Sequence, residues 1–400
     1  MSQLNYLEKL LGGVDVEWLP LGNLAEIGTG KSNRQDETED GEYPFYVRSK
    51  NILRSDTFQF DETAIVVPGE GGIGDIFHFV EGKYALHQRA YRIKATSDVL
   101  DTKFLYHYMS SKFKQYILMK SVGATSISIR KPMLEGFQIP IPCPDNPEKS
   151  LVIQAEIVRI LDAFTAMTAE LTAELTAELN LRKKQYNYYR DKLLSFEEGD
   201  VEWKTLDEVA LDFGRGKSKH RPRNDPSLYG GDIPFIQTGD IRNAAHTIQE
   251  YSQTYSELGL KQSKLWPKGT LCITIAANIA ETSILGFDAC FPDSVIGFVA
   301  NPEETSSSYV EYLLSSIKTQ LEEKGQGSAQ SNINLGTFQN LKLPFPSITE
   351  QERIVTILDK FDTLTSSITE GLPREIELRQ KQYEYYRDLL LSFPKSDEAA

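Results

Sequence analysis

Two short glycine-containing segments carry residue types that bind phosphate in nucleotide-hydrolysing enzymes. Residues 28–32 (Gly-Thr-Gly-Lys-Ser) and residues 214–218 (Gly-Arg-Gly-Lys-Ser) both end in Gly-Lys-Ser. A P-loop also needs a glycine five positions before the glycine that precedes the lysine, because that residue opens the loop around the phosphate. Ala25 and Leu211 stand at those positions. We therefore predict no nucleotide site at either segment.

Other chemical signatures are weaker still. Residues 69–74 match Gly-x-Gly-x-x-Gly, but residues 75–79 predict a second strand instead of the helix that a dinucleotide site requires, so we expect a tight glycine hairpin. The spacing of His, Cys and acidic residues does not match a metal site or a catalytic triad. Three widely spaced cysteines argue against a disulfide framework and favour a reducing cytoplasm. We predict no catalytic residue, cofactor or metal ion in this chain.

Charge is distributed unevenly. The chain has 57 acidic and 43 basic residues, a net charge of −14, which argues against nonspecific binding to nucleic acid. Two segments are nonetheless basic and free of acids, and clustered Lys and Arg suit contacts with DNA phosphates. A solvated basic surface is the alternative. The basic segments contain Lys103, Lys112, Lys114, Lys120, Arg130 and Lys131 in the first half, and Arg215, Lys217, Lys219, His220, Arg221 and Arg223 in the second.

Polar loops add side chains that recognise base edges. Arg, Gln, Asn and Ser offer the donors and acceptors that this recognition needs, although ordinary loop polarity is an alternative explanation. In the first half the candidates are Lys31, Ser32, Asn33, Arg34, Arg48, Lys50, Asn51, Thr125 and Ser126. In the second half they are Gln237, Thr238, Arg242, Ser328, Gln330, Ser331 and Asn332.

One long element occurs twice in the chain. Residues 181–196 recur at 378–393 with thirteen of sixteen positions identical, and residues 154–164 recur at 351–361 with seven of eleven identical, both at an offset of 197. Residues 6–11 resemble the end of this element a third time. The pattern predicts a circular, pseudo-twofold arrangement whose termini lie close together.

Both copies of this element predict long helices. Residues 151–196 lack Gly and Pro, and their apolar residues recur three and four positions apart. Such a helix is about 69 Å long, so a spacer is favoured over a core helix. Two such helices are expected to pack antiparallel, with a bend in the second copy at Gly371 and Pro373. Thr-Ala-Glu-Leu occurs three times in residues 168–179, which indicates an adjustable length element or a tandem duplication without consequence.

The remaining segments mix both kinds of secondary structure. Residues 63–68 and 270–275 are β-rich, whereas residues 102–119 and 308–321 predict helices. We predict an α+β fold with two mixed α/β domains joined by two long antiparallel helices. The expected boundaries are 1–147 and 199–346 for the domains, and 148–198 and 347–400 for the helices.

Together these features resemble the specificity subunits of type I restriction–modification systems, particularly the IC subfamily. The resemblance spans nearly the whole chain and rests on the alternation of variable and repeated segments. It also rests on the Pro-rich run before residues 350–355 (Glu-Gln-Glu-Arg-Ile-Val), the polar loop at 325–333 and the Gln-Tyr-x-Tyr-Tyr-Arg-Asp and Thr-Ala-Glu-Leu repeats. The insertion at residues 145–154 departs from the family pattern.

The resemblance implies a division of labour. Each mixed domain would be a target-recognition domain that reads one half of a bipartite double-stranded DNA site. The helices would set the spacer and dock two modification subunits, which bring S-adenosylmethionine and methylate adenine N6. Restriction subunits would add ATP- and Mg-dependent translocation and cleavage, while this cytoplasmic chain would do no chemistry itself.

Two alternatives remain open at this point. The chain is equally compatible with a reader in a methylation-only or other phage-defence complex. A coiled-coil scaffold without DNA affinity is a third hypothesis, and loss of sequence specificity on mutation of the polar loops would distinguish the readers from it.

Overall fold

The computed structural model describes residues 6–72, 74–120, 128–197, 199–218, 225–244, 246–275, 280–326, 334–366 and 370–394. The chain forms two compact units, which we call unit 1 (Met1–Thr172 with Leu378–Ala400) and unit 2 (Ala173–Glu377). No helix in the described ranges is both long and apolar enough to cross a membrane.

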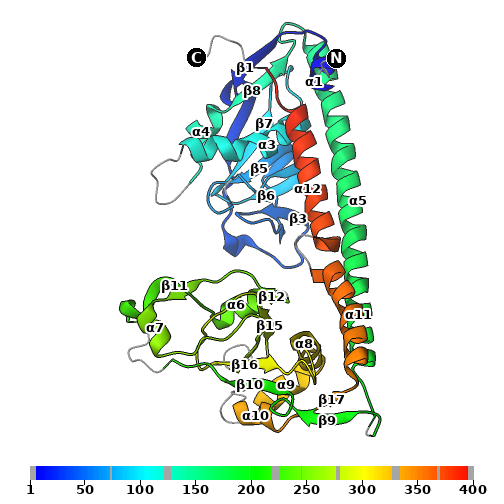
Figure 1. Cartoon of the computed structure of the whole chain (residues 1–400). Coiled ribbons are helices and arrows are strands. Elements are labelled where there is room, and N and C mark those ends of the chain that lie inside the picture. Colours follow the sequence, from blue (N-terminus) through cyan, green and yellow to red (C-terminus); the bar gives the residue numbers. More distant parts are fainter. Residues whose placement is uncertain are drawn as a thin grey trace. The chain divides into compact units, whose positions relative to one another are not determined.

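Unit 1 contains a six-stranded sheet of order β2-β7-β5-β6-β3-β4 (Figure 1). Its neighbouring strands are antiparallel except β3 and β6, and β1 pairs separately with β8 in an antiparallel ribbon. The elements are α1 (Tyr6–Leu11), β1 (Val16–Pro20), α2 (Leu21–Leu24), β2 (Ala25–Thr29), η1 (Arg34–Asp36), β3 (Tyr43–Tyr46), β4 (Leu53–Ser55), β5 (Phe60–Pro68), β6 (His78–Leu86), β7 (Ala90–Ala95), α3 (Thr102–Lys120), α4 (Lys131–Glu135), β8 (Gln138–Pro142) and the first part of α5 (Pro147–Leu193).

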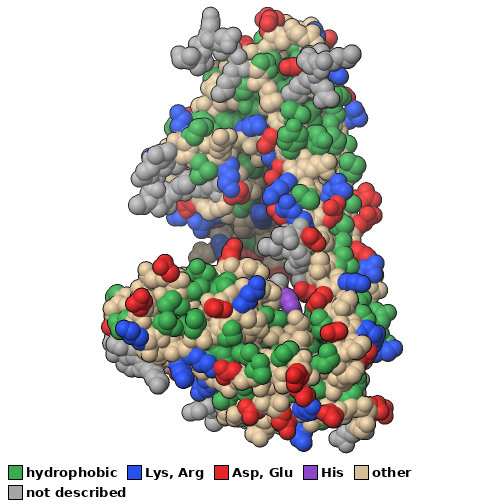
Figure 2. All heavy atoms as spheres, viewed as in Figure 1, with side chains coloured by type: hydrophobic (Ala, Val, Ile, Leu, Met, Phe, Trp, Pro, Cys, Tyr) green, Lys and Arg blue, Asp and Glu red, His purple; other side chains and the backbone are tan. Residues whose placement is uncertain are grey.

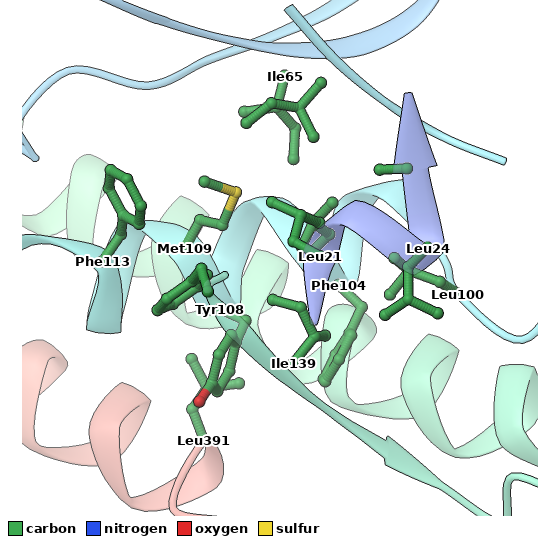
Figure 3. Close-up of a cluster of buried hydrophobic side chains, with 14 of the residues drawn as sticks. Leu21, Leu24, Ile65, Leu100, Phe104, Tyr108, Met109, Phe113, Ile139 and Leu391 are labelled. Carbon is green, nitrogen blue, oxygen red and sulfur yellow. The ribbon is translucent and has the colours of Figure 1, made fainter. Parts of the chain in front are cut away.

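The second half of strand β5, residues 64–68, is buried on both faces of this sheet, with alternate side chains pointing to opposite sides. Ile65 and Val67 pack into the cluster that also holds Phe104 and Met109 of α3 (Figure 3). On the opposite face of the sheet, Ala64 and the buried residues around it form a second, smaller hydrophobic cluster. An uninterrupted apolar run is the sequence pattern expected of such a strand.

Unit 2 contains a five-stranded sheet of order β10-β16-β14-β15-β12 and the ribbons β9–β17 and β11–β13. The helix α8 contacts three strands of this sheet and also α11. The elements are β9 (Glu202–Thr205), β10 (Ala210–Arg215), η2 (Pro226–Leu228), β11 (Tyr229–Phe235), α6 (Thr238–Asn243), β12 (Thr247–Ile248), β13 (Gln253–Tyr255), α7 (Glu257–Lys261), β14 (Leu271–Thr274), β15 (Thr282–Leu285), β16 (Val295–Ala300), α8 (Ser307–Ser316), α9 (Lys318–Gln326), α10 (Leu335–Gln339), β17 (Lys342–Phe345), α11 (Ile348–Ser366) and the start of α12 (Gly371–Leu390).

The repeated helices pack antiparallel within each unit. In unit 1, Phe164 of α5 lies against Tyr386 of α12 with ring centroids 6.1 Å apart. In unit 2, Tyr189 of α5 stacks on Phe361 of α11 at 5.7 Å. The offset of 197 relates Phe164 to Phe361 and Tyr189 to Tyr386, so the same two repeat positions meet in both units. This confirms the antiparallel packing that the repeat predicts.

The bounds of these helices differ in part from the prediction. Helix α5 has 47 residues and runs from Pro147 to Leu193, so it begins one residue before the expected boundary at 148, because proline is tolerated in a first helical turn. The second copy is divided into α11 and α12, as predicted at Gly371. Gly371 has a φ of +77°, and a Cβ there would lie 2.5 Å from the Thr363 carbonyl oxygen, so glycine is required.

The two described ends of the chain meet in unit 1. Leu7 and Leu11 of α1 share the main core of this unit with Leu390 and Phe393. The indole Nε1–H of Trp18 donates to the Pro394 carbonyl at 2.9 Å. The predicted proximity of the termini is therefore confirmed for residues 6–394.

Candidate nucleic-acid interface

A buried glutamine from each repeated helix holds the neighbouring loop in place. In unit 1, Gln154 Nε2 donates to the Val99 carbonyl at 2.7 Å, and Gln154 Oε1 accepts from the Asp101 amide at 2.9 Å. In unit 2, Gln351 Nε2 donates to the Glu304 carbonyl at 2.9 Å, and its oxygen accepts from the Thr305 hydroxyl at 2.8 Å. These bonds fix each mixed α/β region on its helix.

Aspartates about two turns further along the repeated helices contact α3 and α8. Asp162 lies 2.9 Å from His107 Nε2 and 2.7 Å from Lys103 Nζ, and burial lowers the pKa of His107. Asp359 accepts a hydrogen bond of 2.6 Å from the Tyr312 hydroxyl. Lys103, which belongs to the basic segment of the sequence, is thus paired with Asp162 of α5 while its side chain stays partly exposed.

The two Gly-Lys-Ser segments prove to be places where the backbone crosses another chain segment. A Cβ on Gly30 would overlap the Leu86 carbonyl oxygen, and a Cβ on Gly216 would overlap the Phe291 carbonyl oxygen. The second glycine of each segment is therefore needed for close backbone approach. The close backbone approach accounts for the second glycine of each Gly-Lys-Ser segment without a bound phosphate.

In unit 1 this crossing gathers several loops around the glycine hairpin between β5 and β6. The Ser32 amide donates to the Leu86 carbonyl at 3.2 Å, and the Gln88 amide donates to the Ser32 carbonyl at 2.9 Å. The Gly69 amide donates to the Arg89 carbonyl at 2.9 Å, and the Ile129 amide donates to the Gly69 carbonyl at 2.9 Å. Four segments far apart in the sequence therefore adjoin one another.

Charged side chains on these loops pair with each other. Glu70 Oε2 lies 2.9 Å from Arg48 NH1 and 3.1 Å from Arg89 NH1, and the two guanidinium groups lower the pKa of this carboxyl. Lys114 Nζ lies 2.7 Å from Asp75 Oδ1. Arg89 was not among the predicted residues, because it lies alone in a β-turn outside the basic segments.

The other predicted residues of unit 1 differ in accessibility. Ser32 is 6% exposed and its hydroxyl accepts a bond from Gln59, so this side chain helps to hold the loop. Lys112 Nζ lies 3.8 Å from the Asp388 carboxylate of α12, so it joins α3 to the second repeated helix. Thr125 and Ser126 lie outside the described residues. The exposed candidates are Lys31, Asn33, Arg34, Arg48, Lys50, Asn51, Lys114, Arg130 and Lys131, the last within 3.6 Å of Glu135.

Unit 2 brings together the start of its basic segment and the turn before β16. Arg215 Nε donates to the Asp293 carbonyl at 2.7 Å, and the Lys217 carbonyl accepts from the Ser263 hydroxyl at 2.8 Å. Gln237 caps α6, while Thr238 is half-buried and Arg242 is exposed. The predicted residues Lys219, His220, Arg221, Arg223, Ser328, Gln330, Ser331 and Asn332 lie outside the described ranges.

The described surface carries both signs of charge. On the face shown in Figure 2, Lys and Arg side chains are interspersed with Asp and Glu side chains. Among the described residues, no cluster of three or more His, Cys, Asp or Glu side chains is arranged to hold a metal ion. In the described part of unit 1, the basic candidates Arg48 and Lys114 are each paired with an acidic side chain.

Known proteins show the same organisation. The chain matches the family described as "Type I restriction modification DNA specificity domain" over residues 13–181 and again over 198–378. It is 38% identical over 420 residues to the EcoR124I/EcoR124II specificity subunit of Escherichia coli, with 99% of both chains covered. It is 36% identical over 408 residues to a putative type I specificity subunit of Haemophilus influenzae, with 97% of this chain and 98% of the relative covered.

Two solved structures share the fold. A chain of a type I restriction–modification system superposes with a TM-score of 0.66 at 14% identity, covering 94% of this chain and 97% of that one. The HsdS subunit of Thermoanaerobacter tengcongensis superposes with a TM-score of 0.53 at 15% identity, covering 94% and 95%. With both halves of the sequence matched by one family and full-length relatives above 30% identity, the chain belongs to the type I restriction–modification specificity subunits.

Proposed function

We propose that each unit of this chain recognises one half of a bipartite double-stranded DNA site. The observation that carries this proposal is the convergence of loops in unit 1, where exposed Arg, Lys and Asn side chains lie on separate segments that backbone hydrogen bonds join. Side chains of these types reach base edges and phosphates. Membership of the specificity-subunit family supports the same function.

We further infer that the chain acts in the cytoplasm with partners that perform the chemistry. Two modification subunits would carry S-adenosylmethionine and methylate adenine N6, and restriction subunits would use ATP and Mg. The adenine must leave the helix stack to be methylated, so the DNA is expected to be distorted in the complex. Docking of the modification subunits on the repeated helices is supported by Tyr188 and Tyr385. These equivalent repeat positions are 60% and 64% exposed.

A genome-wide map of N6-methyladenine tests this function. Cells that carry the chain with its modification partner are compared with cells that carry the partner alone. We expect a new bipartite motif only when the chain is present, because the chain supplies the sequence recognition. A stable complex that yields no new motif would favour the scaffold hypothesis.

The length of the Thr-Ala-Glu-Leu run is expected to set the gap between the half-sites. Deleting residues 172–175 removes four helical residues, about 6 Å, which is close to the rise of one or two base pairs. We expect the methylated motif to keep both half-sites and to lose one or two base pairs of spacer. The same methylome map measures this, and an unchanged spacer would contradict the proposed role of the run.

Exchange of one recognition unit should alter one half-site. Residues 199–346 are replaced by the corresponding segment of another specificity subunit, leaving both repeated helices in place. We expect one half of the methylated motif to change and the other half to persist, which also assigns each half-site to its unit. If both halves changed, recognition would not be modular.

A further inference from the structure

The cluster formed by Arg48, Glu70 and Arg89 has a composition unsuited to phosphate binding. One carboxylate lies between two guanidinium groups, with Glu70 Oε2 accepting from both NH1 nitrogens. A carboxylate at the centre of the cluster repels a phosphate. The same carboxylate holds the NH1 end of each guanidinium group, which is useful where a flat, directional donor is needed.

The guanidinium groups retain donors for a further partner. Each arginine uses NH1 for Glu70, and among the described residues the other side-chain N–H groups of Arg48 and Arg89 have no protein acceptor. All three side chains are about half exposed, at 45% for Arg48 and Glu70 and 56% for Arg89. The cluster can therefore be reached from solvent with most of its donors available.

The backbone holds the cluster at a fixed place. Glu70 sits in the hairpin whose Gly69 amide donates to the Arg89 carbonyl at 2.9 Å. The segment of Arg48 is held by a bond of 2.9 Å from the His87 amide to the Tyr46 carbonyl, two residues before Arg48. Gly71 has a φ of +71°, a left-handed conformation that glycine adopts without strain. Side chains on such anchored loops lose little freedom when they bind.

A guanine–cytosine pair complements this arrangement in the major groove. Guanine presents two acceptors, O6 and N7, which match two N–H groups of an arginine, and cytosine presents the N4 amino group, which matches a carboxylate. We propose that Arg48, Glu70 and Arg89 read a guanine–cytosine pair in the half-site of unit 1. In this role Glu70 positions the arginines and accepts from cytosine. The proposal rests on the proposed function, that this unit recognises DNA.

The test uses Glu70→Gln in the complex with the modification partner, read out by the methylome map. Glutamine keeps the shape but replaces a pure acceptor by a group that also donates. We expect one guanine–cytosine position in the half-site that survives exchange of residues 199–346 to become degenerate, with the other half-site and the spacer unchanged. The matched control is Glu156→Gln, which removes the carboxylate of an Arg–Glu pair on α5 in the same unit and should leave the motif as it was.

A motif identical to that of the unaltered chain, or a change in the other half-site, would overturn the assignment to Glu70. Absence of any motif with the unaltered chain would instead overturn the proposed function. If Glu70→Gln abolished methylation altogether, the proposal is tested instead by measuring DNA binding by the unaltered complex. Duplexes carrying 7-deazaguanine at one guanine at a time should show one position where binding weakens roughly fivefold to tenfold, since N7 is lost. Equal binding at every position would refute the proposal.

Discussion

Replacing Gly30 with alanine is expected to lower the free energy of unfolding of unit 1 by about 3–5 kcal/mol. The added Cβ would overlap the Leu86 carbonyl, so the two segments would have to separate. Separation also breaks the backbone bonds that join Ser32 to Leu86 and Gln88. Urea denaturation followed by tryptophan fluorescence measures the loss.

The neighbouring glycine provides the control for this substitution. A Cβ on Gly28 would lie 3.4 Å from Arg92 Nε, an ordinary contact, so Gly28→Ala should change stability by less than about 1 kcal/mol. Unit 2 repeats the contrast, because a Cβ on Gly216 overlaps the Phe291 carbonyl, whereas Gly214 has open space around it. Equal effects at the first and second glycine of either pair would show that backbone crossing does not explain the motif.

This crossing also shows what the sequence could and could not predict. The pattern of residues 28–32 excluded a P-loop by a missing glycine, but it contained no sign of the partner segment. Leu86 is 56 positions away from Gly30, and its carbonyl meets Gly30 only after the sheet has formed. Where two backbone segments far apart in the sequence approach closely, the sequence shows only the glycine that permits the approach.

The repeated helices were predictable because their signal is local and occurs twice. Apolar residues three and four positions apart define a helical face without knowledge of the rest of the fold. The identity at an offset of 197 further implied that the two copies have equivalent surroundings. Phe164 with Tyr386 and Phe361 with Tyr189 satisfy that expectation in the two units.

The candidate DNA contacts were less predictable because a basic side chain can face several surroundings. Lys103 and Lys112 of α3 turn toward aspartates of the repeated helices, and Lys114 pairs with Asp75 of the hairpin. One helix thus directs neighbouring lysines to different partners, and composition alone does not separate them. Arg89 was hard to predict for a different reason. Its proposed role depends on its pairing with Glu70, which lies 19 positions earlier in the sequence.

The buried glutamines should contribute strongly to stability through their loops. In Gln154→Leu, the Asp101 amide loses its acceptor and the Val99 carbonyl loses its donor from the glutamine side chain. A buried polar group left without its partner costs about 1–3 kcal/mol, so we expect a loss of about 2–4 kcal/mol in the free energy of unfolding. Gln351→Leu should produce a similar loss in unit 2, where Glu304 and Thr305 are affected.

An exposed glutamine separates this effect from the change of residue type. Gln380 on α12 is exposed, and Gln380→Leu should alter stability by no more than about 0.5 kcal/mol. Denaturant titration of the three variants and the unaltered chain gives the comparison. Because leucine is apolar and of similar size, a cost confined to Gln154 and Gln351 must come from unpaired polar groups. A cost shared by Gln380, or absent at the buried positions, would mean that these hydrogen bonds do not hold the recognition units on their helices.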